Sequence, residues 1–274
     1  MPHELPHAHP DRVMKVVASP TQAATSPIAA SWCRSANHHG LEPDSELRRS
    51  LLPGAEMAML RQQNDSLLRV ARPVLDQLFT SVGRTGCCVV LSNADGIILE
   101  SRATDGDRRM FEGVGLTPGA RWSESTEGTN GIGTCIAEQR AVIIHRDQHF
   151  AARNIGISCM DAPVHDSAGR LVAALDVSSC RDDHSETMAS LIATVVQDAA
   201  RRIERDFFVH AFAGSRIVMA PDDGAGTAML AVDRDDIVIG ASRAARLRYR
   251  LTDASFARPR TATEILGEAV QPSF

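Results

Sequence analysis

A glycine-rich, polar segment in the middle of the chain has the residue types that build ligand sites. It reads Arg-Trp-Ser-Glu-Ser-Thr-Glu-Gly-Thr-Asn-Gly-Ile-Gly-Thr over residues 121–134, and an apolar run follows at 134–137. Glycine permits a bent backbone, and small polar residues offer amide and hydroxyl groups before the start of a helix. The segment therefore predicts a concave binding site. A helix-capping turn without a ligand is the alternative interpretation.

The spacing of the glycines argues against the two common phosphate loops. The chain contains no GxxxxGK[ST] pattern, and Gly128, Gly131 and Gly133 do not match GxGxxG after a strand. We therefore predict neither a P-loop nor a dinucleotide site, and leave the cofactor unknown.

Seven side chains in and after this segment are candidates for lining the site. They are Trp122, Glu127, Asn130, His145, His149, Phe150 and Cys159. Some have ordinary alternatives, because an aromatic ring such as Trp122 also serves as core packing, and Asn130 also suits a loop with unusual dihedral angles.

Two histidines and a cysteine in this set suggest metal or thiol chemistry as alternatives. His145 and His149 are four residues apart, which places both on one face only if they lie on a helix, and residues 141–145 read as a strand. With Cys159 they make a His2Cys set compatible with zinc, copper or iron. No carboxylate or second cysteine follows at motif spacing, so we predict no metal. A reactive Cys159 thiol, with its pKa lowered by His145 or His149, is the enzymatic alternative.

Short apolar runs predict the sheet that positions these residues. Residues 87–100 read as a hairpin around Asn-Ala-Asp-Gly, and residues 157–164 and 171–177 read as two strands joined by a turn at 166–169. A further strand is predicted at 141–145. This order predicts an α+β fold with a mostly antiparallel sheet.

Amphipathic helices are predicted before and after this sheet. One covers residues 25–39, with Ser26-Pro27 as its start and Gly40 as its end. A second covers residues 55–82, where Pro73 marks a kink or a boundary. The third covers residues 186–212, with an apolar stripe formed by Met188, Leu191, Ile192, Val195, Ala199, Ile203 and Phe207. Two such stripes predict packing on the sheet or across a two-fold axis, and hence a homodimer.

The two ends of the chain have a different character. Residues 1–20 are rich in Pro and His, so we predict a disordered tail, with metal binding by its histidines as a weak alternative. After residue 212, a connection at 215–227 precedes a strand-turn-strand pattern at 228–240 and a short helix at 243–250. The arginines at 243–260 are interpreted as a solvated face, because no nucleic-acid-binding pattern accompanies them.

Composition narrows the class of protein. The chain has 274 residues, of which 43% are hydrophobic, so it can bury one large or two modest cores. Its net charge of -5 offers no overall basic field for nucleic acid. Six irregularly spaced cysteines, without CxxC or a signal sequence, predict a reduced cytoplasm. No apolar run approaches the roughly 20 residues that span a bilayer, so we predict no membrane insertion.

Three motifs together resemble one sensory-domain family. RWSExxEGTNGIGT, then IHxxxHF, then CxxAPVxDxxGxLxxxLDVS are similar to the GAF sensory domain of the acetoin catabolism regulators, with their shorter Fis-type relatives, over roughly residues 25–212. The resemblance implies a GAF-like antiparallel sheet flanked by long helices. It divides the chain into an N-terminal helical region (21–84), a GAF sensor domain (85–212) and a partial PAS-like or linker segment (213–274).

The resemblance also implies a function. A GAF module of a bacterial transcriptional regulator is expected to bind a small metabolite or redox effector, such as a carbonyl or alcohol compound, and to relay it through the flanking helices. DNA would be contacted only through an output domain absent from this chain. The signature of cyclic-nucleotide GAF domains and the cysteine arrangement of the free methionine sulfoxide reductases are not found. A thiol-dependent enzyme or redox sensor using Cys159, and a purely structural dimerisation module, are the alternatives.

Overall fold

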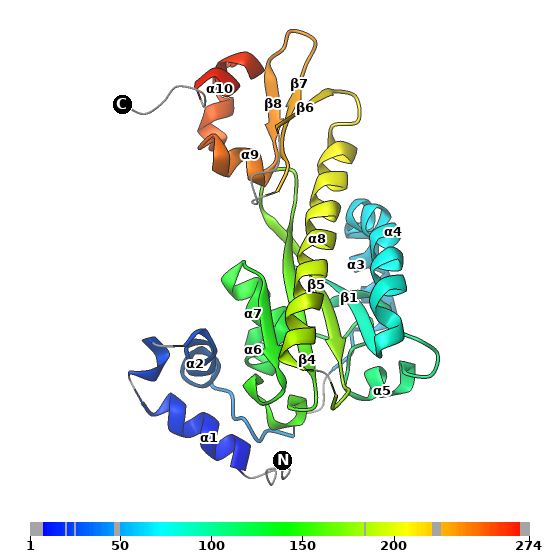
Figure 1. Cartoon of the computed structure of the whole chain (residues 1–274), viewed down its shortest axis with the longest axis vertical. Helices are drawn as coiled ribbons and strands as arrows, with labels where there is room; N and C mark the ends of the chain where they lie inside the picture. Colours follow the sequence, from blue (N-terminus) through cyan, green and yellow to red (C-terminus); the bar gives the residue numbers. More distant parts are fainter. Residues whose placement is uncertain are drawn as a thin grey trace. The chain divides into compact units, whose positions relative to one another are not determined.

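A computed structural model describes residues 8–19, 21–24, 26–46, 50–183, 185–220 and 226–268 (Figure 1). The chain divides into two compact units. The first comprises Met1–Pro163 and Ala173–Ala200, and the second comprises Val164–Val172 and Arg201–Phe274. Within the described ranges, no helix combines the length and apolar character that crossing a bilayer requires.

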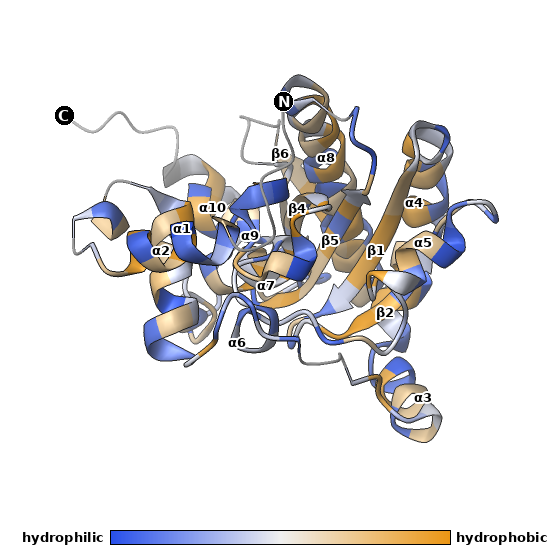
Figure 2. Cartoon of the chain, turned by 90° about the horizontal axis from the view of Figure 1, so that it is seen from below, coloured by the Kyte–Doolittle hydropathy of each residue, from blue (hydrophilic) through white to orange (hydrophobic). Residues whose placement is uncertain are grey.

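A five-stranded antiparallel sheet forms the centre of the first unit. Its strands are β1 (Cys87–Asn93), β2 (Ile98–Arg102), β3 (Val142–His145), β4 (Ser158–His165) and β5 (Leu171–Ser179), in the order β2-β1-β5-β4-β3. Both predicted hairpins and the strand at 141–145 are confirmed. Strand β1 is buried along its whole length and apolar in all but its last two residues (Figure 2). The predicted α+β fold is confirmed, and β3 is left as an edge strand.

Short helices and the sheet enclose a hydrophobic core cluster of the first unit. They are α5 (Arg108–Gly113), α6 (Glu124–Glu127) and α7 (Gly131–Glu138). Phe111, Trp122 and Ile132 pack against Val90 and Ile144 in this core. Single-turn 3-10 segments connect the larger elements at Gln22–Ala24, Gly83–Thr85, Arg146–Gln148 and Ala152–Asn154.

The N-terminal residues form two helices, so the disordered tail predicted for residues 1–20 is wrong over most of its length. Helix α1 covers Ala8–Val17, and α2 covers Pro27–Cys33 and continues as a π-helix over Arg34–His38. Val13 of α1 is buried against Trp32 and Phe150, which supplies the apolar contact that the Pro- and His-rich composition concealed. Pro10 is tolerated because it lies in the first turn. Residues 1–7 and 20 lie outside the described residues.

The predicted helix at 25–39 is confirmed. The Ser26 side chain caps α2 by accepting from the Ala29 N–H, Pro27 occupies the first turn, and Gly40 ends the helix with a φ of +65°. The helix predicted at 55–82 is divided into α3 (Gly54–Gln63) and α4 (Asp65–Val82). The division falls at Asn64, and Pro73 lies inside α4, so Pro73 is not the boundary.

Helix α8 (Glu186–Ala211) confirms the third predicted helix but buries a different stripe. In the first unit its buried residues are Ala189, Ile192, Ala193, Val196 and Ala200, and the predicted Met188, Leu191 and Val195 are exposed. Ile192 and Ile203 of the predicted stripe are buried, so the prediction is confirmed at these positions. It missed the buried alanines because it favoured large apolar residues.

The second unit contains a three-stranded sheet, β6 (Arg216–Ala220), β7 (Ala228–Val232) and β8 (Val238–Ala241), in that order. Helices α9 (Arg243–Arg248) and α10 (Ala262–Glu268), with a 3-10 turn at Asp253–Phe256, complete it. Leu230, Val232, Leu251 and Ile265 lie in its core. The strand-turn-strand and short-helix predictions hold. Strand β6 was missed, because it was interpreted as part of a connection at 215–227, of which residues 221–225 lie outside the described residues.

Candidate ligand site

The glycine-rich segment folds onto the sheet as a tightly packed loop. Asn130 caps α7, and its side-chain oxygen accepts from the Gly133 N–H at 2.8 Å. A Cβ atom on Gly131 would overlap the side chains of Asp161 and Cys159, so only glycine allows this approach. The capping interpretation therefore accounts for Asn130, which is fully buried.

Three further candidate residues have structural partners around this loop. Trp122 is buried, and its indole N–H donates to the Gly115 carbonyl at 2.8 Å. The buried Glu127 carboxylate accepts from Arg153 at 2.9 Å and from Asn154 at 3.2 Å. Glu127 and Phe150 also line a small cavity of about 150 Å³.

Beneath the loop lies a buried chain of polar side chains that sequence reasoning identified only in part. His149 and Cys159, both predicted, are joined by a 3.5 Å contact between Nε2 and Sγ, and His149 Nδ1 lies 2.8 Å from the Arg146 carbonyl. Ser178 Oγ lies 3.2 Å from Cys159 Sγ and donates to the Asp176 carboxylate at 2.8 Å. This series of polar side chains therefore connects an imidazole to a carboxyl group inside the core.

Two buried carboxyl groups, Asp161 and Asp176, lie at the far end of this series of polar side chains. Neither was among the predicted residues. Burial raises the pKa of Asp161 well above its ordinary value, with the charge of Asp176 as a second cause. Burial also raises the pKa of Asp176 to about 7, against a lowering by the Ser178 hydroxyl. Neither Asp161 carboxyl oxygen has a hydrogen-bond partner within the described part of the chain. An aspartate in the middle of each apolar strand was the sequence signal for this pair.

His145 does not join this cluster. In the register of β3 and β4, His145 stands opposite Ser158 and Ile144 stands opposite Cys159, so His145 and Cys159 face opposite sides of the sheet. His145 Nδ1 lies 2.9 Å from Ser158 Oγ. The alternative His145, His149 and Cys159 metal site is therefore wrong. Among the residues with described positions, no three His, Cys, Asp or Glu side chains form a group that could hold a metal ion.

The Cys159 thiol lacks the environment of a reactive cysteine. Burial raises its pKa well above the ordinary value, and the charges of Asp176 and Asp161 raise it further. A nucleophilic cysteine needs a stabilised thiolate in an accessible, electropositive place. The thiol-dependent alternative is therefore not favoured.

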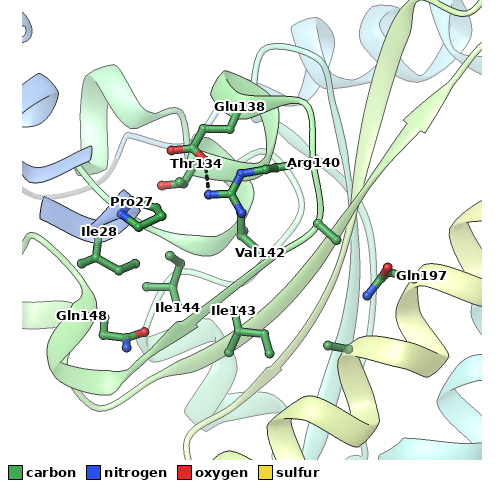
Figure 3. A pocket seen from close by; sticks show the side chains of 12 residues that line it. Pro27, Ile28, Thr134, Glu138, Arg140, Val142, Ile143, Ile144, Gln148 and Gln197 are labelled. Carbon is green, nitrogen blue, oxygen red and sulfur yellow. Dashed lines mark ion pairs between the residues drawn. The ribbon is translucent and has the colours of Figure 1, made fainter. Parts of the chain in front are cut away.

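A cavity of about 370 Å³ opens along the free edge of β3 (Figure 3). Its walls come from α2, the end of α7, β3 and α8. The lining residues are Pro27, Ile28, Thr134, Glu138, Arg140, Ala141, Val142, Ile143, Ile144, Gln148, Ala193 and Gln197. In Figure 3 Arg140 and Glu138 lie together at one end, and Gln148 and Gln197 lie apart at two other corners. The isoleucines and Val142 give the cavity an apolar middle.

Ion pairs connect the rim of this cavity to the glycine-rich loop. One Glu138 carboxylate oxygen accepts from Arg140. The other accepts from Arg34 Nη2 at 3.1 Å. Arg34 also donates to the buried Glu124 at 3.2 Å. Ser31 donates to Glu124 at 2.5 Å, so α2 is held against the loop by charged and hydroxyl groups.

Comparison with known proteins supports the family resemblance that the sequence motifs indicated. The model of the GAF domain family matches residues 66–203, half of the chain. The acetoin catabolism regulatory protein of Cupriavidus necator is 30% identical over 225 residues, covering 80% of this chain and 34% of that protein. The acetoin dehydrogenase operon transcriptional activator AcoR of Bacillus subtilis is 29% identical over 180 residues, covering 64% of this chain and 29% of that protein.

The fold has a counterpart among solved structures. A chain in the crystal structure of the E. coli DhaR(N)-DhaL complex superposes with a TM-score of 0.60 at 17% identity, covering 89% of this chain and 84% of that chain. This chain spans about a third or less of the length of the curated relatives named above. Those relatives are regulators of transcription, and the chain belongs to the GAF domain family.

Proposed function

We propose that this chain is the effector-sensing module of a bacterial transcriptional regulator and that it binds a small molecule in the cavity beside β3. The observation that carries the proposal is the position of that cavity. It is walled by α7, which the glycine-rich loop begins, and by α8, the long helix that follows the sheet. Eight of its lining residues lie within the predicted range 113–160, and membership of a family found in transcriptional regulators supports a sensory role.

The proposed relay runs from the cavity into the flanking helices. Ala193 and Gln197 belong to α8, and Pro27 and Ile28 belong to α2, so a bound molecule would contact both helices directly. A ligand shifts a conformational equilibrium only by its difference in affinity for the two states. If α2 or α8 packs differently in the two states, a ligand that contacts the helix has a different affinity for each state.

We further propose that the module works as a homodimer in the cytoplasm. Met188, Leu191 and Val195 are 41%, 62% and 43% exposed and recur at helical spacing on α8. This apolar surface suits a second copy of the same helix across a two-fold axis. DNA contact is proposed for a part of the regulator outside these residues, because this chain shows no basic field.

The predicted residues keep a supporting role in this proposal. Trp122, Glu127 and Asn130 hold the loop that begins α7. The Phe150 N–H donates to the Thr129 carbonyl of this loop, and His149 contacts Cys159 on β4. The effector is proposed to be a metabolite rather than a redox agent, because Cys159 is buried.

The test is a thermal-shift screen with small acids, ketones, diols and amines. A ligand at 100 times its dissociation constant adds about 2.7 kcal/mol to the free energy of unfolding. Gln197→Phe, which fills the cavity from α8, is expected to abolish the shift. Gln62→Phe on the exposed surface of α3 is the matched control and should leave it unchanged. The proposal fails if no compound stabilises the protein, or if hits stabilise Gln197→Phe as strongly as the unaltered chain.

A further inference from the structure

We infer that the β3 cavity takes a short peptide in extended conformation, held as an added strand along the free edge of β3. This inference rests on the proposed function and names the ligand class of the same cavity. Strand β3 lies at the end of the sheet, so no strand within the described residues pairs with its outer edge. An unpaired edge offers backbone N–H and carbonyl groups to another extended chain.

The register of β3 with β4 decides which backbone groups face the cavity. The Arg146 N–H, directly after β3, donates to the Ile157 carbonyl at 2.9 Å. Residues bonded to the neighbouring strand alternate along an antiparallel ladder, so the next residue bonded to β4 is Ile144. Ile143 and His145 therefore turn both their N–H and their carbonyl groups to the free edge, where the cavity lies.

The Gln148 side chain already imitates one residue of an added strand. Its Oε1 accepts from the outward His145 N–H at 2.8 Å, as the carbonyl of a neighbouring strand would. Gln148 therefore occupies the position that an added strand would use at this end of β3. The N–H and carbonyl of Ile143 are the next outward pair along the strand. An added strand that begins beside Gln148 has room for only a few residues.

The cavity walls suit the alternating side chains of an extended peptide. Val142 and Ile144 pack with Ile28 of α2, and α8 contributes Ala193 and Gln197. In Figure 3 Ile28 and Gln197 lie on opposite sides of the β3 residues. Successive side chains of a strand point to opposite faces, so one peptide side chain would meet α2 and the next would meet α8. A volume of about 370 Å³ is at the small end for ligand sites and suits a short peptide.

A peptide can meet both backbone groups of Ile143 at once. In antiparallel pairing one peptide residue donates its own N–H to the Ile143 carbonyl and accepts from the Ile143 N–H through its own carbonyl. In parallel pairing the carbonyl before that residue and the N–H after it make the two bonds. Either arrangement gives affinity through the main chain, and the apolar walls select the side chains.

Methylation of single peptide nitrogens tests this pairing. The parent probe is N-acetyl-leucine N′-methylamide, whose leucine N–H and terminal N–H point to opposite edges of the extended molecule. One derivative carries a methyl group on the leucine nitrogen, and the other carries a second methyl group on the terminal nitrogen. Dissociation constants are measured by ligand-observed NMR titration of the whole chain.

We expect the parent probe to bind and only one of the two methyl groups to weaken it. The loss should be ~10-fold, the range of one hydrogen bond, and the other derivative should bind as the parent does. Sensitivity at the leucine nitrogen indicates antiparallel pairing, and sensitivity at the terminal nitrogen indicates parallel pairing.

Two substitutions at Ile143 test the protein side of the same bonds. Ile143→Pro removes the outward N–H, and proline is tolerated on an edge strand where its nitrogen faces away from the neighbouring strand. It should weaken the parent probe ~10-fold. Ile143→Val keeps the N–H on a similar side chain and should bind the parent nearly as well as the unaltered chain does. If urea unfolding shows that Ile143→Pro is not folded, the methylated probes on the unaltered chain decide the test.

The outcomes separate this inference from the proposed function. Equal affinity of all three probes, or equal weakening by both methyl groups, overturns the inference. Binding of the parent that Gln197→Phe leaves unchanged also overturns it, because the probe then lies outside the cavity. If no peptide probe binds and a compound of the thermal-shift screen does, the inference is overturned and the sensor is kept. Failure of every probe and every screened compound overturns both.

Discussion

Replacing Asp176 by Asn should remove much of the pH dependence of the protein's stability between pH 4 and pH 7. Asp176 is fully buried, and burial is the main cause that raises its pKa from the ordinary 3.8 to about 7. The folded state therefore holds this proton more tightly than the unfolded state does. The resulting stabilisation is complete below pH 3.8 and is lost as the pH rises through 7. Asparagine keeps an oxygen for the Ser178 hydroxyl and does not titrate.

The size of the effect follows from the difference between the two pKa values. Each pH unit corresponds to about 1.4 kcal/mol, so the rise from 3.8 to about 7 corresponds to roughly 4 kcal/mol of unfolding free energy. This is an upper limit, because Asp161 and Asp176 interact and therefore titrate as a pair. Burial also raises the pKa of Asp161, so Asp161→Asn should lower the slope as well.

Urea unfolding at half-unit intervals from pH 4 to pH 8 measures this slope. Asp105→Asn, at a fully exposed side chain, is the control for removing one carboxylate. The difference between the unaltered chain and Asp176→Asn should grow steadily above pH 4 and level off above pH 7. Parallel curves for both Asn variants and the unaltered chain would refute the raised pKa values of the two buried carboxyl groups.

Three further predictions concern packing, reactivity and assembly. Gly131→Ala should destabilise the protein by about 1–3 kcal/mol in urea unfolding, because its methyl group has no room; Gly156→Ala, with open space around it, should not. Cys159 should resist iodoacetamide at pH 7 in the native protein and react only after unfolding, as peptide mass spectrometry will show. Leu191→Glu should lower the fraction of dimer in sedimentation velocity, whereas Ser190→Glu on the neighbouring position should not.

The parts of the fold with local signals were predictable. Ser26-Pro27 specifies a helix start through a cap and a fixed φ angle, and Asn93-Ala-Asp-Gly96 specifies a hairpin, because these preferences act within four residues. The apolar stripe of α8 was predicted at Ile192 and Ile203 and missed at its buried alanines, because alanine ranks low in hydrophobicity but fits closely against a sheet. Helix α1 was missed because its anchor, Val13, gains its partners from residues far along the chain.

The candidate site was less predictable, because it depends on strand register and on how completely side chains fill space. His145 and Cys159 were expected to share a wall, and the register that separates them is a tertiary property of β3 and β4. Side chains occupy the volume beneath the glycine-rich loop, and residue spacing in the sequence does not predict which side chains these are. Asp161 and Asp176 were visible as charged residues within apolar strands, a pattern that indicates buried titratable groups.

The register that separates His145 from Cys159 also links the cavity to the buried carboxyl pair. Val142 and Ile144 line the cavity, and across the β3–β4 ladder they stand opposite Asp161 and Cys159. A displacement of β3 alone would strain the buried hydrogen bonds among Cys159, Ser178 and Asp176, and breaking a buried hydrogen bond is costly. The sheet therefore resists local deformation at this edge. On the opposite wall a ligand would contact α8 at Ala193 and Gln197, so that helix is the element through which we expect a relay to start.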